Sequence, residues 1–169
     1  MDGRRRAFLR GAFLTSAGRA REIRRQQPLG PVPPWHQGMP LAEHCLDCAQ
    51  PCVGACEPGI ICIHPDTHEF AGIPYLDFSA NGCTFCQACV EACPIELDTS
   101  GPRPVIGVVQ LNRSSCIAWK EIICMSCSDR CEYSAITTTN MRQPQVNADS
   151  CTGCGMCVTA CPVNALQIA

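Results

Sequence analysis

The chain has 169 residues, of which 17 are cysteine and only 5% are aromatic, and its net charge is −2. This length fits one ordinary domain or two small ones, and so few aromatic residues leave a thin hydrophobic core. Such a fold needs disulfides or metal centres as cross-links. The odd number of cysteines and their spacing of two or three residues disfavour a disulfide framework and favour metal binding.

The first 25 residues are rich in arginine, whereas the rest of the chain is acidic. Residues 5–10 resemble a twin-arginine export motif, but the apolar run that follows is short and is interrupted by more arginines, so we do not expect export. The segment is either a flexible solvated tail or a basic docking arm. Residues that could share one apolar helix face are Phe8, Ala12, Phe13 and Ile23.

Residues 28–40 contain too many prolines for a helix or a central strand. We interpret them as a linker or strap that Trp35 anchors to the folded body, and we assign residues 1–40 to the basic arm and this strap. No stretch has the ~18 consecutive apolar residues of a transmembrane helix. We therefore expect a cytoplasmic protein.

Four groups of four cysteines follow the strap. In chain order they are Cys45, Cys48, Cys52 and Cys56; Cys83, Cys86, Cys89 and Cys93; Cys116, Cys124, Cys127 and Cys131; and Cys151, Cys154, Cys157 and Cys161. Groups two and four have the spacing CxxCxxCxxxCP of bacterial [4Fe-4S] ferredoxins. Group one has one extra residue before Cys52, and an insertion displaces Cys116 of group three upstream.

Short secondary-structure elements are expected around these groups. Residues 73–78 predict an edge strand, a short helix starts near Ala88 and stops before Pro94, and residues 105–111 predict another strand. A hairpin of residues 135–139 and 145–147 and a last strand at residues 165–168 complete the chain.

Each half of the chain holds one irregular group followed by one regular group, and residues 100–104 form a break between the halves. We therefore predict an α+β fold of tandem bacterial two-[4Fe-4S] ferredoxin-like units, small and loop-rich, at residues 41–100 and 101–169.

In two-cluster ferredoxins the fourth cysteine of each run binds the other cluster. This crossover rule predicts four ligand sets. They are Cys45, Cys48, Cys52 with Cys93; Cys83, Cys86, Cys89 with Cys56; Cys116, Cys124, Cys127 with Cys161; and Cys151, Cys154, Cys157 with Cys131. The expected cofactors are three to four [4Fe-4S] clusters. Zinc is disfavoured because its sites usually combine two CxxC pairs across a longer loop.

Several residues near these groups have two interpretations. Cys62 is either a buried apolar side chain or a substitute ligand if Cys52 cannot reach its cluster. His36, His44, His64 and His68 are expected at the surface rather than in catalysis. Gly82, Gly153 and Gly155 are expected to let backbone N–H groups approach the cluster sulfides.

The sequence has no glycine-rich nucleotide loop and no convincing pair of nucleophile and base, so we do not expect an enzyme. Two functional classes remain open from the cysteines alone. The protein is either an electron carrier or a factor that assembles iron–sulfur centres for a partner.

Further motifs carry a family resemblance over nearly the whole length. They are the arginine-rich start, Pro33-Pro34-Trp35, His44-Cys45, the segment NGCTFCQACVEACP at residues 81–94, the displaced Cys116 before Cys124, and CTGCGMCVTACPVNA near the end. The chain resembles the NapF-type ferredoxins of bacterial periplasmic nitrate reductase systems. The resemblance implies a cytoplasmic protein that contacts the precursor of the molybdenum-containing catalytic subunit and assists its maturation before export. Nucleic acid is not expected as a partner, and a monomer is expected.

Overall fold

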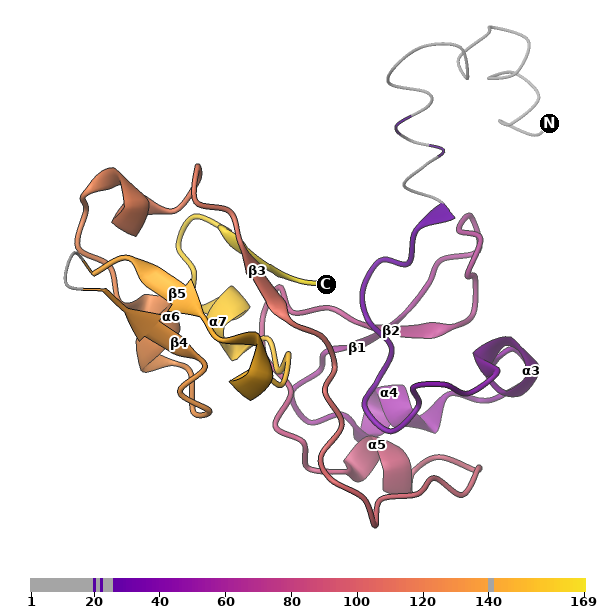
Figure 1. Cartoon of the computed structure of the whole chain (residues 1–169). Helices are drawn as coiled ribbons and strands as arrows, with labels where there is room; N and C mark the ends of the chain where they lie inside the picture. The colour runs from indigo at the N-terminus through magenta and orange to yellow at the C-terminus, as the bar shows by residue number, and fades with distance from the viewer. Residues whose placement is uncertain (1–19, 21, 23–25, 140–141) are drawn as a thin grey trace, which may run out of the picture.

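The computed structural model describes residues 20, 22, 26–139 and 142–169. The chain forms two halves that lie side by side, and the segment before and including β3 runs between them (Figure 1). The export-like motif and all four residues of the expected apolar helix face lie outside the described residues.

The N-terminal half consists of short helices around one hairpin. Its elements are α3 (Leu41–Cys45), α4 (Pro51–Ala55), β1 (Ile61–Ile63), β2 (Pro74–Leu76) and α5 (Ala88–Glu91). Strands β1 and β2 pair antiparallel, with buried Ile61 opposite buried Leu76. Pro74 is tolerated because β2 has a neighbour on one side only. Helix α5 starts at Ala88 and ends before Pro94, as the sequence predicts.

The C-terminal half contains two antiparallel strand pairs. Its elements are β3 (Val109–Leu111), η2 (Ile117–Lys120), α6 (Ser126–Asp129), β4 (Ile136–Thr138), β5 (Pro144–Val146), η3 (Ala148–Ser150), α7 (Met156–Thr159) and β6 (Leu166–Ile168). The β4–β5 pair confirms the predicted hairpin. The predicted last strand pairs with β3, which is shorter than the expected strand at residues 105–111. Strand β1 was not predicted.

The proline-rich strap packs on β2. Pro33 and Pro34 are fully buried, and the carbonyl of Pro31 accepts a hydrogen bond of 2.8 Å from the backbone N–H of Leu76. The ring of Trp35 meets the ring of Phe85 edge-on, with 6.2 Å between the centroids. The expected role of Trp35 as the anchor of the strap is thereby confirmed.

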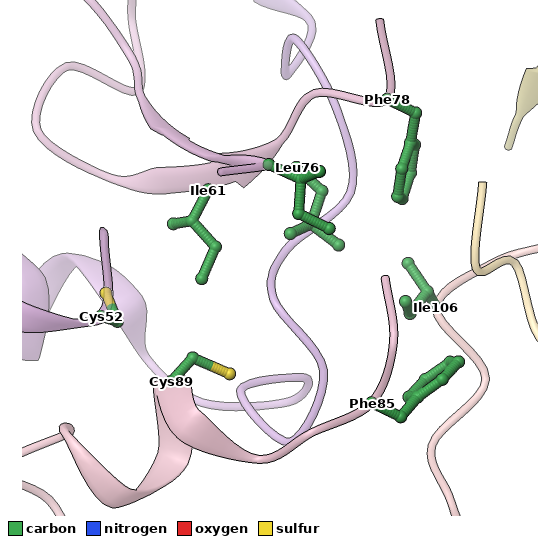
Figure 2. Packing of buried hydrophobic residues seen from close by; sticks show 8 residues of the cluster. Cys52, Ile61, Leu76, Phe78, Phe85, Cys89 and Ile106 are labelled. Carbon is green, nitrogen blue, oxygen red and sulfur yellow. The ribbon is translucent and has the colours of Figure 1, made fainter. Parts of the chain in front are cut away.

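Cysteines form much of the small core. In the N-terminal half, Cys52 and Cys89 pack beside Ile61 and Leu76, and Figure 2 shows Phe78, Ile106 and Phe85 along one edge of the same cluster. Ile106 lies beyond the predicted boundary at residues 100–104, yet it packs with this half. The assignment of units to residues 41–100 and 101–169 therefore stays a prediction.

Candidate metal centres

Four cavities are each lined by four cysteines. We call them sites one to four after the cysteine group that supplies three of the four side chains. Site one is lined by Cys45, Cys48, Cys52 and Cys93; site two by Cys83, Cys86, Cys89 and Cys56; site three by Cys116, Cys124, Cys127 and Cys161; and site four by Cys151, Cys154, Cys157 and Cys131. Their empty volumes are alike, between about 320 and 420 Å³ including space open to solvent.

These four sets are the ones that the crossover rule assembles from the sequence. Cys52 lines site one despite the extra residue before it, because helix α4 begins at Pro51 and carries the thiol inward. Cys62 lies on β1 and lines none of the four cavities, so the structure gives it no place as a substitute for Cys52. The binding of iron by these thiols stays a prediction.

Four short helices each place one buried cysteine in a site. These residues are Cys52 on α4, Cys89 on α5, Cys127 on α6 and Cys157 on α7, each between 7% and 9% exposed. Left-handed residues precede three of these helices: Gln50, Gln87 and Gly155 have φ values of 56°, 67° and 79°. A left-handed residue turns the chain sharply, so the cysteines of the preceding loop and of the following helix can face the same cavity.

Each site also has one backbone hydrogen bond to a cysteine sulfur. The donors are the N–H groups of Gln50, Phe85, Ala165 and Ala135, and the acceptors are Cys48, Cys83, Cys161 and Cys131 at 3.2 to 3.4 Å. Hydrogen bonds of this kind stabilise negative charge on sulfur, and around iron–sulfur centres they tune the reduction potential.

Burial opposes ionisation of the deepest thiols. It raises the pKa of Cys83 and Cys127 to about 11 and that of Cys89 and Cys157 to about 12. Neighbouring cysteines raise these values further, because several thiolates close together repel one another. Iron ions would supply the positive charge that makes such a set of thiolates stable.

The spacing of the thiols suits a cluster better than a single ion. Within the part of the chain that the structure describes, no three cysteine, histidine or carboxylate side chains converge on a position for one metal ion. A zinc ion draws four ligands to about 2.3 Å from one centre. A [4Fe-4S] cluster takes three cysteines from one tight run and a fourth from elsewhere, which is the set that lines each of the four cavities.

An orphaned hydroxyl supports the same fit at site four. The Oγ1 atom of Thr152 is buried without a hydrogen-bond partner, and Thr152 lines the cavity of site four. A buried hydroxyl without an acceptor costs free energy. A cluster or its thiolates would provide the missing acceptor.

Two of the three glycines singled out in the sequence, Gly82 and Gly155, lie at the contact between the two halves, and Gly153 lies against the segment that leads into β3. A Cβ atom on Gly82 would come within 2.8 Å of the Cys154 carbonyl oxygen, and one on Gly155 would collide with the ring of Phe78. A Cβ on Gly153 would collide with the backbone of Gly107. These glycines therefore leave room for neighbouring chain segments, a role that sequence reasoning missed.

The expectation of surface histidines is wrong for three of the four. His36, His64 and His68 are 3%, 3% and 9% exposed, and only His44 is exposed. His36 lines site one and donates from Nδ1 to the carbonyl of Pro34 at 3.0 Å. His64 and His68 stack with ring centroids 4.7 Å apart. The prolines around them suggested exposure, whereas the strap covers His64, and His68 packs against His64 and Phe70.

Comparison with known proteins decides the family. Residues 144–167 match the model of the 4Fe-4S binding domain. The chain is 31% identical over 171 residues to the ferredoxin-type protein NapF of Escherichia coli (strain K12), which covers 98% of this chain and 94% of the relative. It belongs to the NapF family of ferredoxin-type proteins.

Two further relatives agree with this assignment. The ferredoxin-type protein NapF of Haemophilus influenzae is 34% identical over 172 residues, which cover 97% of this chain and 92% of the relative. The methylamine utilization ferredoxin-type protein MauM of Methylorubrum extorquens is 30% identical over 167 residues, with coverages of 89% and 73%. The resemblance seen in the sequence is confirmed, and the chain is a ferredoxin-type iron–sulfur protein.

Among the residues that the structure describes, none of the helices combines the length and the apolar character needed to cross a bilayer.

Proposed function

We propose that this protein is a cytoplasmic accessory ferredoxin of a periplasmic nitrate reductase system. Its sixteen grouped cysteines hold [4Fe-4S] clusters at three to four sites. It contacts the precursor of the molybdenum-containing catalytic subunit and assists iron–sulfur assembly or reduction in that precursor before export. The protein itself is a monomer and not an enzyme.

One observation carries the proposal: four cavities of similar size, each lined by four cysteines and each with one N–H···S hydrogen bond, occur in a chain of the NapF family. When bound, [4Fe-4S] clusters supply one-electron redox chemistry. The chain's own contribution is to hold the thiols, donate hydrogen bonds to them and surround them with apolar side chains. The link to nitrate reductase rests on the family.

Electron transfer to a redox partner is the second candidate. It is favoured by the packing of α4 against α5 and of α6 against α7, because these helix pairs bring two sites together within each half. A protein with several redox centres in contact is suited to passing single electrons.

The timing of depletion separates the two functions. The protein is removed from cells after the nitrate reductase has been exported, and the activity of the exported enzyme is then assayed. A maturation factor leaves that activity intact and abolishes only the activity of newly made enzyme. An immediate loss of activity would refute the maturation role and support electron transfer.

The basic arm is assigned to partner contact. Deletion of residues 1–25 should leave the visible absorbance of the clusters unchanged and weaken binding to the precursor of the catalytic subunit. Equal binding by the shortened and the full chain would exclude that role for the arm.

A further inference from the structure

The two halves meet where site two and site four adjoin. The backbone N–H of Cys83, which lines site two, donates a hydrogen bond of 2.7 Å to the carbonyl of Cys154, which lines site four. Phe78 of the N-terminal half lies directly over Gly155, where any Cβ would collide with its ring. The backbones of the two cysteine runs therefore touch directly at this point.

Arg103 joins the same two cavities from outside. Its guanidinium carbon lies 5.0 Å from the ring centroid of Phe85 and 5.3 Å from that of Tyr133, and Nη1 donates a hydrogen bond to the Tyr133 hydroxyl. The two rings meet edge-on with centroids 6.4 Å apart. Phe85 lines site two and Tyr133 lines site four, so one cation bridges a wall residue of each cavity.

The position of Arg103 in the chain strengthens this bridge. Arg103 lies in the segment that passes between the halves, and three residues later buried Ile106 packs in the N-terminal core. The N–H of Ile106 donates a hydrogen bond of 2.9 Å to the carbonyl of Thr152, which lines site four. The connecting segment is thus fixed to both halves and is not a free linker.

We propose that Arg103, Phe85 and Tyr133 clamp the two halves together. The clamp positions the iron–sulfur clusters held at sites two and four so that they interact magnetically and exchange electrons. This inference rests on the proposed binding of clusters. Together with the contacts of α4 with α5 and of α6 with α7, the clamp arranges the four sites in one continuous row, in the order one, two, four, three. The chain then acts as one four-centre unit and not as two independent ferredoxins.

The test compares the full-length, cluster-loaded protein with an Arg103→Ala variant. The matched control is Arg113→Ala, because Arg113 also stacks on an aromatic ring, that of Trp119 at 4.3 Å, but away from the contact between the halves. Iron per chain is measured first. Electron paramagnetic resonance of the dithionite-reduced protein then reports magnetic interaction between clusters, and hydrogen exchange of peptides containing Cys83 reports opening of the contact.

We expect equal iron content in all three proteins. Arg103→Ala should weaken the magnetic interaction and speed exchange at Cys83 about fivefold, whereas Arg113→Ala changes neither. Arg103→Lys, which keeps the cation, should restore part of both signals. Phe78→Leu disturbs the contact between Phe78 and Gly155, and it should also weaken the magnetic interaction and speed exchange at Cys83.

The outcomes separate this inference from the proposed function. A wild-type protein without iron at sites two and four refutes the proposed function, whatever the exchange data show. Full iron content with unchanged resonance and exchange in Arg103→Ala refutes the clamp alone.

Discussion

The hydrogen bond from the Cys83 N–H to the Cys154 carbonyl, 2.7 Å long, ties together the two regular cysteine runs of the chain. Each run lines its own cavity, and the backbones of the two runs are in contact at Gly82, Cys83 and Cys154. Damage to the contact on one side should therefore reach both sites.

Replacement of Gly155 should destabilise the protein. Its φ of 79° disfavours any other residue, and a Cβ there would collide with the ring of Phe78. We expect Gly155→Ala to lower the free energy of unfolding by about 3 kcal/mol. Thermal loss of the visible cluster absorbance measures this effect.

Gly54→Ala is the matched control for this substitution. Gly54 lies in helix α4, and an added Cβ would meet no atom within 4 Å. Alanine should stabilise the helix there by about 0.5 kcal/mol. Equal effects of the two substitutions would show that the contact with Phe78 is unimportant.

Loss of Cys131 should remove the cluster of the most regular motif. Cys131 stands 20 positions before Cys151 but lines the same cavity as the run that begins there. We expect Cys131→Ala to lower the iron content by about four atoms per chain. Cys62→Ala is the control, since Cys62 lines none of the four cavities. An intact fourth cluster in Cys131→Ala would contradict the crossed arrangement.

Thr152 should raise the reduction potential at site four. Its orphaned hydroxyl can donate a hydrogen bond to sulfur, and such a bond stabilises the more negative, reduced form. Thr152→Val should make the potential of one cluster more negative without loss of iron, whereas Thr152→Ser should keep it near the wild-type value. A redox titration followed by electron paramagnetic resonance measures the reduction potential of each cluster. Identical potentials in Thr152→Val and the wild type would exclude the Thr152 hydroxyl as a hydrogen-bond donor to the cluster.

His64 should make the strap sensitive to acid. Its Nδ1 donates to the Ile73 carbonyl at 2.7 Å, so the neutral ring accepts the Leu29 N–H at Nε2, 3.1 Å away. Burial lowers the pKa of His64 below its ordinary value of 6.5, and nearby His68 lowers it further. A lowered histidine pKa contributes stability that is complete above pH 6.5 and is lost as the pH falls below it.

Limited proteolysis of residues 28–40 at several pH values measures this effect. Cleavage in the wild type should rise as the pH falls from about 8 to about 5.5. His64→Phe keeps an aromatic ring but cannot accept the Leu29 N–H, so its cleavage should be faster and largely independent of pH. A wild type without pH dependence would rule out His64 as the strap's acid-sensitive contact.

The cysteine spacing predicted much of the candidate site. The repeated CxxC units require short loops, and the crossover rule already names the partners Cys56, Cys93, Cys131 and Cys161 from the other run of each half. The hairpin and the last strand follow from β-branched and alternating residues near turns. Strand β1 was not predicted because Ile61, Cys62 and Ile63 are all apolar and show no alternation with polar residues.

Contacts between distant segments could not be predicted in the same way. The burial of His64 depends on the strap that covers it, and the bridge by Arg103 depends on two rings far apart in the sequence. The roles of Gly82 and Gly155 could not be predicted for the same reason. Their lack of a side chain was visible, but the backbone and the ring that require it come from the other half.

The cysteine chemistry could be predicted from the sequence, because metal binding depends on which thiols lie a few residues apart and such local spacing is fixed by the covalent chain. The tertiary structure alone decided how the two halves meet. That contact depends on backbone groups, a buried ring and one arginine that come together only when each half has folded. The same physical difference explains why the four cysteine sets could be named in advance and the adjacency of sites two and four could not.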